Sequence, residues 1–231
     1  MSIIVITEDK SPTLYAKGKQ VHYHSVFGAI GESDHVFIQG SNLKELLKSA
    51  EEPVSILEIG YGTGLNFVLT LMKREEVNPT KELYYEAFEP EPLEEALLLE
   101  FYAQTELPTR FVESAIYPAK VKQQLPGVEL KLCEEPFSPD CPETRQFDII
   151  YYDAFAPSAA PEMWTAEMIG KAVALLKPGG VLVTYSVTGD IKRILRQLPV
   201  DFNRPPGYGK KREMLYVKKR SPADATAEDP K

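Results

Sequence analysis

The sequence predicts an α/β domain with a mainly parallel sheet, helices on both faces of that sheet, and a β-rich segment added at the N-terminus. Two observations support this fold class. From residue 54 onward, short apolar runs alternate with helical patterns, as is typical of parallel sheets. Before that point, residues 3–7, 13–15 and 20–24 are rich in β-branched and aromatic side chains, and Gly18 indicates a hairpin.

The elements follow from these patterns. We expect strands at residues 54–59, 83–88, 128–132, 147–152, 180–185 and 214–218. We expect helices at 42–50 (with Asn42 as N-cap), 65–74, 93–105, 115–124, 165–176 and 190–198. Lys177-Pro-Gly-Gly180 predicts a turn before a strand. The chain therefore divides into a β-rich extension (1–41), a main domain (42–220) and a tail (221–231) that we expect to be disordered.

Composition excludes several classes of protein. No apolar run approaches the ~20 residues of a membrane helix, and the N-terminus lacks the features of a signal peptide. We therefore expect a cytoplasmic protein that does not bind membranes. Two cysteines, Cys133 and Cys141, do not make a zinc site, and three histidines near the N-terminus are better explained by packing. We expect no metal.

The most informative motif is Glu58-Ile-Gly60-Tyr61-Gly62-Thr-Gly64-Leu-Asn66-Phe67, which follows the first strand of the expected sheet. Glycines let a ligand approach the main chain closely, and the next helix offers unpaired N–H groups. The third glycine comes one residue too early for a dinucleotide fingerprint, and Leu65 stands where a phosphate loop needs Lys. The remaining alternative is an ordinary strand, turn and helix with glycines for tight packing.

The pattern Glu-x-Gly-x-Gly-x-Gly resembles that of class I S-adenosylmethionine-dependent methyltransferases. The resemblance implies a Rossmann-like fold with a mainly parallel seven-stranded sheet, and S-adenosylmethionine as cofactor. A carboxylate at Glu58 suits the ammonium group of that cofactor.

Acidic residues also follow the next two strands. Glu89 is the candidate for the ribose hydroxyls, because ligands bind at the carboxyl ends of such strands. Glu91 is second, and is better explained as an acid at a helix N-terminus. Glu134 is slightly favoured for the adenine amino group, with an exposed loop acid as an equal alternative.

Asp153 follows the fourth strand of the expected sheet and is the candidate catalytic residue. An amine must be neutral to attack a sulfonium methyl group, and it becomes cationic as the new bond forms. A nearby carboxylate orients the amine, stabilises the growing charge and accepts a proton, while positioning supplies much of the remaining catalysis. The alternative is a structural Asp that caps the following turn.

Charge is distributed unevenly along the chain. The net charge is −8, yet residues 186–220 hold ten Lys or Arg and only three acids. Such asymmetry indicates either a basic face for a polyanion or a solvated surface that balances the rest.

Several blocks occur together in an order that resembles one family. They are Glu58 to Phe67, Asp153-Ala-Phe-Ala-Pro157 with Pro161-Glu-Met-Trp-Thr165, Thr184-Tyr-Ser186, Gly209-Lys-Lys-Arg-Glu-Met214, and His24-Ser-Val-Phe-Gly28 leading to Glu32-Ser-Asp-His-Val-Phe-Ile38. They are similar to the methyltransferase domain of the bacterial bifunctional tRNA 5-methylaminomethyl-2-thiouridine enzymes. The resemblance implies methylation of the aminomethyl group on wobble uridine 34 of tRNA.

The resemblance also assigns residues. Glu58, Gly60, Gly62 and Gly64 are expected at the methionine end of the cofactor, within a motif that includes Tyr61 (commonly Phe in the family), Asn66 and Phe67. Glu89 is expected at the ribose and Asp153 at the reacting amine. Phe155, Trp164 and Tyr185 are expected to wall the pocket and stack the base, Lys210, Lys211 and Arg212 to contact RNA phosphates, and His24 and Ser25 to close the cofactor pocket. The block that contains Glu134 departs from the usual Gly-Asp.

Rival functions stay open on the sequence alone. They are a methyltransferase for a small molecule or protein, an aminopropyltransferase like spermidine synthase, and a cofactor-binding module without activity. The sequence contains no second glycine-rich fingerprint for a flavin domain. We therefore expect either that any oxidase that prepares the amine is a separate partner, or that the substrate already carries its amine.

Overall fold

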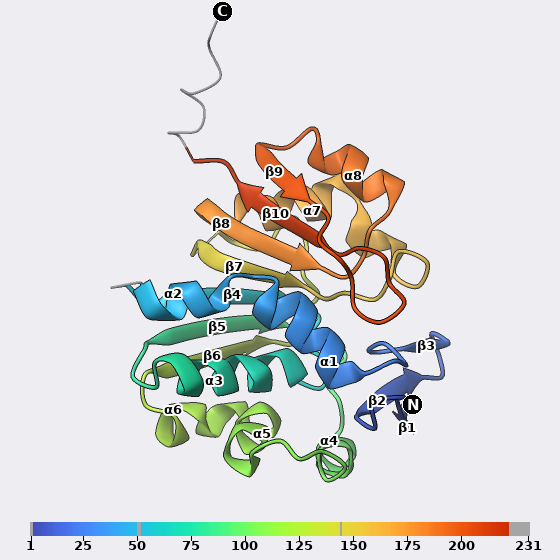
Figure 1. Ribbon diagram of the computed structural model, residues 1–231, viewed down its shortest axis with the longest axis vertical. Helices are drawn as coiled ribbons and strands as arrows, with labels where there is room; N and C mark the ends of the chain where they lie inside the picture. Colours follow the sequence, from blue (N-terminus) through green and yellow to red (C-terminus); the bar gives the residue numbers. More distant parts are fainter. Residues whose placement is uncertain (1, 50–51, 144, 222–231) are drawn as a thin grey trace, which may run out of the picture.

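The computed structural model describes residues 2–49, 52–143 and 145–221, and its centre is a seven-stranded sheet (Figure 1). The strand order is β6-β5-β4-β7-β8-β10-β9. The strands are β4 (Val54–Ile59), β5 (Leu83–Phe88), β6 (Val128–Cys133), β7 (Phe147–Tyr152), β8 (Leu176–Thr184), β9 (Val200–Asn203) and β10 (Leu215–Lys219). Strands β4 to β8 pair in parallel, and β10 is antiparallel to β8 and β9. This architecture confirms the predicted fold class.

The central strands read as continuous apolar runs because both faces of the sheet are covered. All six residues of β4 are buried. Val54 and Ile56 join the hydrophobic core on one face, whereas Leu57 and Ile59 join the core on the other. This alternation is the period of two of a β-strand.

Helices fill both layers (Figure 1). The first core receives side chains from helices α1 to α6 and the π-helix η1, and the second from the 3₁₀-helix η3 with α7 and α8. The first set is α1 (Ala29–Ser33), η1 (Asp34–Gln39), α2 (Leu43–Ser49), α3 (Leu65–Val77), α4 (Glu95–Tyr102), α5 (Thr109–Ile116), the 3₁₀-helix η2 (Pro118–Lys120) and α6 (Val121–Gln124). The second set is η3 (Pro161–Trp164), α7 (Ala166–Ala174) and α8 (Gly189–Leu195). None of the helices in the described ranges is long and apolar enough to span a membrane.

The N-terminal segment is only partly β-rich. Strands β1 (Ser2–Ile6), β2 (Pro12–Ala16) and β3 (Val21–His22) form a small antiparallel sheet. Residues 29–39, expected within the β-rich extension, are helical instead, because Val36, Phe37 and Ile38 bury their side chains in the main core. The predicted tail lies outside the described residues, apart from Ser221.

Some element boundaries differ from the predictions for local reasons. The helix expected at 115–124 is divided into α5, η2 and α6 at Pro118, whose ring disfavours helical backbone in the preceding residue. Residues 177–180 form a bulge inside β8 and not a turn before it, since Phe147 pairs with Leu176 and Ile149 with Val181. Strand β9 is missing from the predicted elements.

The carboxyl ends of the parallel strands meet at one edge of the sheet, and the small sheet β1–β3 lies beside that edge (Figure 1). Loops from distant parts of the chain therefore converge there. This convergence positions the candidate site.

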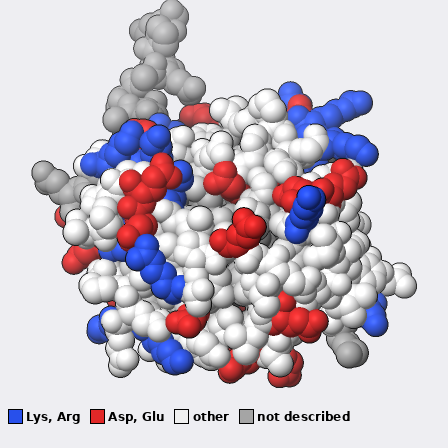
Figure 2. All heavy atoms as spheres, turned by 60° about the horizontal axis from the view of Figure 1, so that its bottom comes forward, with Lys and Arg blue, Asp and Glu red and all other residues white. Residues whose placement is uncertain are grey.

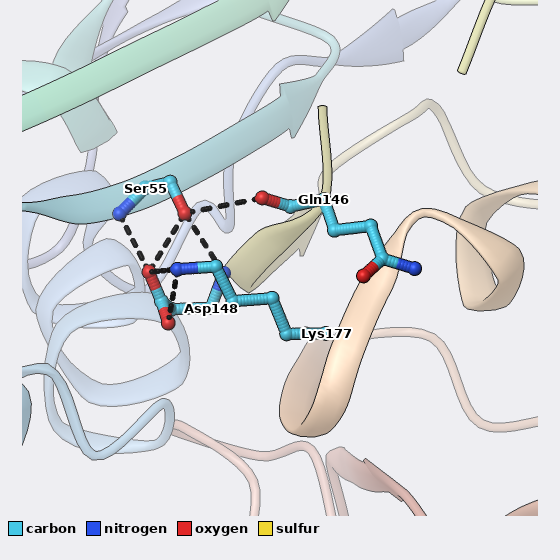
Figure 3. A network of polar contacts seen from close by, with 4 residues as sticks. All are labelled: Ser55, Gln146, Asp148 and Lys177. Carbon is cyan, nitrogen blue, oxygen red and sulfur yellow. Dashed lines mark hydrogen bonds and ion pairs between the residues drawn. The ribbon is translucent and has the colours of Figure 1, made fainter. Parts of the chain in front are cut away.

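At the opposite edge, a polar network joins the starts of three strands (Figure 3). The Asp148 carboxylate accepts hydrogen bonds from the Ser55 backbone N–H (2.8 Å) and hydroxyl (2.7 Å). Lys177 Nζ donates to both Asp148 oxygens, at 2.9 and 2.8 Å. One carboxylate thus fastens β4, β7 and β8 together.

We expect Asp148→Ala to lower the free energy of unfolding by about 1–3 kcal/mol, because it leaves the backbone N–H of buried Ser55 without its acceptor. Urea unfolding measures the change. The matched control is Asp201→Ala, which removes an exposed ion pair with Arg220 and should cost less than about 1 kcal/mol. Equal losses in the two variants would contradict this account of the network.

Candidate active site

A cavity opens at the carboxyl edge of the sheet, between the N-terminal segment and the loops after β4, β5, β6 and β7. Six of the residues predicted as site residues line it, namely Gly60, Tyr61, Gly62, Glu89, Asp153 and Phe155. His24, expected to close the cofactor pocket, lines it as well. The remaining lining includes Glu91, the second candidate for the ribose, and residues that the sequence did not indicate, among them Tyr23 and Phe137.

The glycine loop is held in a conformation that side chains resist. Gly60, Gly62 and Gly64 have φ values of +96°, +54° and +76°. A Cβ atom on Gly60 would lie 2.6 Å from the Asp153 carbonyl oxygen, and one on Gly64 would lie 2.8 Å from the Tyr61 ring. The glycine loop therefore packs directly against Asp153 at the end of β7. Along this wall the cavity is lined by main-chain atoms of the loop.

Glu89 is fixed at the cavity by backbone donors. The Gly62 N–H donates to one of its oxygens at 2.8 Å, and the Glu91 N–H donates to the other at 3.0 Å. Burial raises the pKa of Glu89, and these two hydrogen bonds act in the opposite direction. A carboxylate held in this way suits a vicinal diol, as predicted for the ribose.

The loop after β6 contributes aromatic and not acidic lining. Phe137 and Pro136 line the cavity with Phe88, and the two phenylalanine rings meet edge to face at 5.3 Å. Glu134 is exposed and does not line the cavity. Phe137, three residues after Glu134, lines the cavity instead.

Glu58 and Asn66 lie behind the glycine loop and not in the cavity wall. Glu58 is fully buried, and its oxygens accept hydrogen bonds from Asn66 Nδ2 (2.7 Å) and the Tyr85 hydroxyl (2.8 Å). Burial raises the pKa of Glu58 to about 8. Phe67 is a core residue whose ring packs on Tyr85, with ring centroids 4.9 Å apart.

Asp153 lies at the centre of the site. Its backbone N–H donates to the Ile59 carbonyl at 2.9 Å, and its Oδ2 accepts from Asn66 Nδ2 at 2.8 Å. Burial and the neighbouring Glu58 raise the pKa of Asp153 well above its usual range. A carboxyl group in such surroundings is a better proton acceptor than one in water.

The two other aromatic candidates hold the loop after β7 and do not wall the cavity. Trp164 is buried and donates from Nε1 to the Phe155 carbonyl at 2.8 Å. The Tyr185 hydroxyl donates to the Ala154 carbonyl at 2.9 Å. These bonds satisfy backbone groups on either side of Phe155 and keep its ring at the cavity.

The N-terminal segment covers the mouth of the cavity. The Tyr23 ring meets Phe155 edge to face at 5.1 Å. Lys19 Nζ lies 5.0 Å from the Phe155 ring centroid and 3.3 Å from a Glu91 oxygen. His24 lines the wall as a neutral ring, since burial lowers its pKa to about 4, and its Nδ1 has no partner among the described residues.

The three basic candidates separate in the structure. Lys211 turns inward, where it forms an ion pair with buried Glu32 and lies 4.2 Å from the Tyr185 ring centroid. Lys210 and Arg212 are exposed, and Lys210 Nζ lies 4.5 Å from the Phe27 ring centroid. The Lys211 ammonium group is therefore paired with a carboxylate of this chain, whereas Lys210 and Arg212 extend into solvent.

Basic side chains elsewhere in residues 186–220 also have acidic neighbours. Arg193, Arg204 and Arg220 each form an ion pair, with Asp190, Glu213 and Asp201 respectively. On the face in Figure 2, basic and acidic groups stand beside each other and do not form one continuous basic surface. The charge asymmetry of the sequence is thus partly neutralised locally.

Known proteins resemble this chain over most of its length. One relative is a protein of Paraburkholderia xenovorans named tRNA 5-methylaminomethyl-2-thiouridine biosynthesis bifunctional protein MnmC. The two are 30% identical over 206 residues, and the aligned region covers 84% of this chain and 31% of that protein. The protein of the same name from Idiomarina loihiensis is 31% identical over 209 residues, with 84% and 34% covered. The chain thus spans about a third of the length of these curated relatives.

Solved structures of two proteins are similar to the structure of this chain. The crystal structure of MNMC2 from Aquifex aeolicus superposes with a TM-score of 0.81 at 27% identity, covering 96% of this chain and 72% of that one. A putative class I S-adenosylmethionine-dependent methyltransferase from Listeria monocytogenes matches at a TM-score of 0.50 and 14% identity, over 81% and 59% of the two chains, which shows a shared fold.

A family model described as S-adenosyl-L-methionine-dependent methyltransferase matches residues 101–220, just over half of the chain. The cofactor and enzyme class predicted from the sequence are thereby confirmed. This chain therefore belongs to the family of S-adenosyl-L-methionine-dependent methyltransferases.

Proposed function

We propose that this methyltransferase acts in the cytoplasm on the aminomethyl group of wobble uridine in tRNA, converting it to methylaminomethyl. The observation that carries the proposal is Asp153, a half-buried residue at the cavity wall whose carboxyl has a raised pKa. An oxidase outside this sequence is part of the proposal, because the amine must first be prepared.

The residues present fit S-adenosylmethionine. We assign the ribose hydroxyls to Glu89, the adenine to the apolar surface of Phe88 and Phe137, and the methionine end to the backbone at Gly60 and Gly62. When bound, the cofactor supplies an electrophilic methyl group on a sulfonium. Lining by carboxylates suits a ligand that carries positive charge.

Asp153 then accepts the proton that the acceptor amine loses on methylation. The new N–CH₃ bond forms as the S–CH₃ bond breaks, and the amine nitrogen gains positive charge that a carboxylate stabilises. The surplus proton passes to Asp153, directly or through water. The burial that raises its pKa makes this transfer from an ammonium group less unfavourable.

Three features support tRNA as the acceptor. The named relatives are tRNA biosynthesis proteins, and their similarity covers 84% of this chain. Phe155 lies at the covered mouth of the cavity, where an aromatic ring can stack a base that has left its helix. Lys210 and Arg212 remain exposed near the helical N-terminal segment as contacts for phosphates.

The test is methyl transfer from labelled S-adenosylmethionine to bulk tRNA from a strain that lacks this gene. We expect label in tRNA, and expect Asp153→Asn to lower kcat at least about 10²-fold because its amide cannot accept the proton. Cofactor affinity, measured by calorimetry, should change little. Label in a small-molecule or protein fraction, with none in tRNA, would overturn the proposal. Equal loss of turnover and cofactor affinity in Asp153→Asn would place that residue at the cofactor instead.

The salt dependence of tRNA binding tests the phosphate contacts. The double variant Lys210→Ala, Arg212→Ala should flatten the plot of log K against log[salt] by about 1 to 2 units of slope, since each phosphate contact contributes slightly less than one. The charge-matched control is Lys120→Ala, Lys122→Ala, in η2 and α6 beside the edge strand β6. An unchanged slope in the first variant, or an equal change in the control, would contradict this role.

A further inference from the structure

The Asn66 amide joins two carboxyl groups, that of buried Glu58 and that of Asp153 at the cavity wall. Asn66 Nδ2 donates one hydrogen bond to Glu58 Oε1 at 2.7 Å and another to Asp153 Oδ2 at 2.8 Å. An amide NH₂ has two protons, and both are used here. Asn66 belongs to the first turn of α3, Glu58 to the end of β4, and Asp153 follows β7, so the bridge joins three elements.

The array continues away from the cavity. The Tyr85 hydroxyl donates to the second oxygen of Glu58 at 2.8 Å, and Tyr85 itself is fully buried in the core. Tyr85, Glu58, Asn66 and Asp153 therefore form a chain of hydrogen bonds from the core to the cavity wall. Only its last member lines the cavity.

This geometry distinguishes two roles for Asn66. The sequence groups it with the cofactor residues, but it is 2% exposed and does not line the cavity. Its amide nitrogen is instead directed to the side of Asp153 that faces the protein. A group in that position acts on the reaction through Asp153.

We propose that Asn66 is a positioning residue, which holds Asp153 through Oδ2 and leaves Oδ1 for the acceptor amine. The inference rests on the proposed function of Asp153. A donor at this position also separates two carboxyl groups that would repel each other if both were charged. Asp at position 66 would add a third acid, and an apolar residue would remove the Asn66 donor from both carboxyls, leaving Glu58 with Tyr85 alone.

Other groups contribute to the field around Asp153, and any pH profile must include them. Glu58 and Glu32 disfavour its charged form, whereas Lys211 and the Asn66 amide favour it. Tyr185 and the neutral His24 ring complete the titratable surroundings, and Glu89 lies across the cavity. Asn66 differs from all of these because its amide does not titrate, and it acts on Asp153 through a hydrogen bond.

The experiment compares Asn66→Asp and Asn66→Ser with the control Asn78→Asp, which makes the same change just after the other end of α3. We expect both Asn66 variants to lower kcat about 10²-fold with nearly unchanged cofactor Kd, because a misplaced group costs rate and not affinity. The acid limb of kcat should move to higher pH. The lost N–H donor had favoured charged Asp153, so its pKa rises and activity is lost at a higher pH as the solution is acidified.

A second measurement does not depend on tRNA. Calorimetry in two buffers of different ionisation enthalpy counts the protons released when S-adenosylmethionine binds. We expect the cationic cofactor to release protons from the two bridged carboxyls, and the pH at which release is greatest to be higher in Asn66→Asp than in the wild type. Asn78→Asp should match the wild type.

The outcomes separate the two proposals. If the wild type transfers no methyl group to tRNA, the proposed function fails, and the proton count alone decides the role of Asn66. A wild-type pH profile and proton count in both Asn66 variants would overturn the inference. Loss of cofactor affinity with normal kcat at saturation would make Asn66 a cofactor contact, and would also overturn it.

Discussion

The site depends on the parallel pairing of β4 with β7, which brings two strand ends within contact of each other. The Asp153 N–H continues the ladder by donating to the Ile59 carbonyl at 2.9 Å, and Gly60 then passes so close to Asp153 that no Cβ fits between them. The glycine loop after β4 and the end of β7 therefore pack as one unit. Because parallel strands expose their carboxyl ends together, the loops after β5 and β6 reach the same cavity.

The loops at this edge are ordered by side chains that satisfy their backbone groups. Trp164 and Tyr185 donate to carbonyls in the loop after β7, and the Tyr102 hydroxyl donates to the Thr63 carbonyl in the glycine loop at 2.9 Å. A buried carbonyl without a partner is costly, so these aromatic side chains stabilise the loops with their polar ends while their rings fill the core. Of the three aromatic residues predicted to wall the pocket, Phe155 lines the cavity, whereas Trp164 and Tyr185 hold its loop.

Acidic residues divide into those that face the cavity and those that stabilise it from behind. Glu89 accepts backbone hydrogen bonds and lines the wall, whereas Glu58 has the same side chain but is enclosed by protein donors. Both lie near a strand end and read alike in sequence. The direction of the side chain decides between them, because successive residues of a strand point to opposite faces and the turn that follows re-aims the chain.

The sequence by itself determined the layered fold, the glycine loop and the place of Asp153 at a strand end, since these depend on local patterns of apolar period, turn residues and strand ends. Only the tertiary structure decided which neighbours each side chain meets. It exchanged Glu134 for Phe137 in the cavity, moved Trp164 and Phe67 into the core, and paired Lys211 with Glu32 across 179 positions of sequence. The Lys211–Glu32 ion pair, for example, depends on how α1 and the β9–β10 loop pack together, and no periodicity within either segment contains that information.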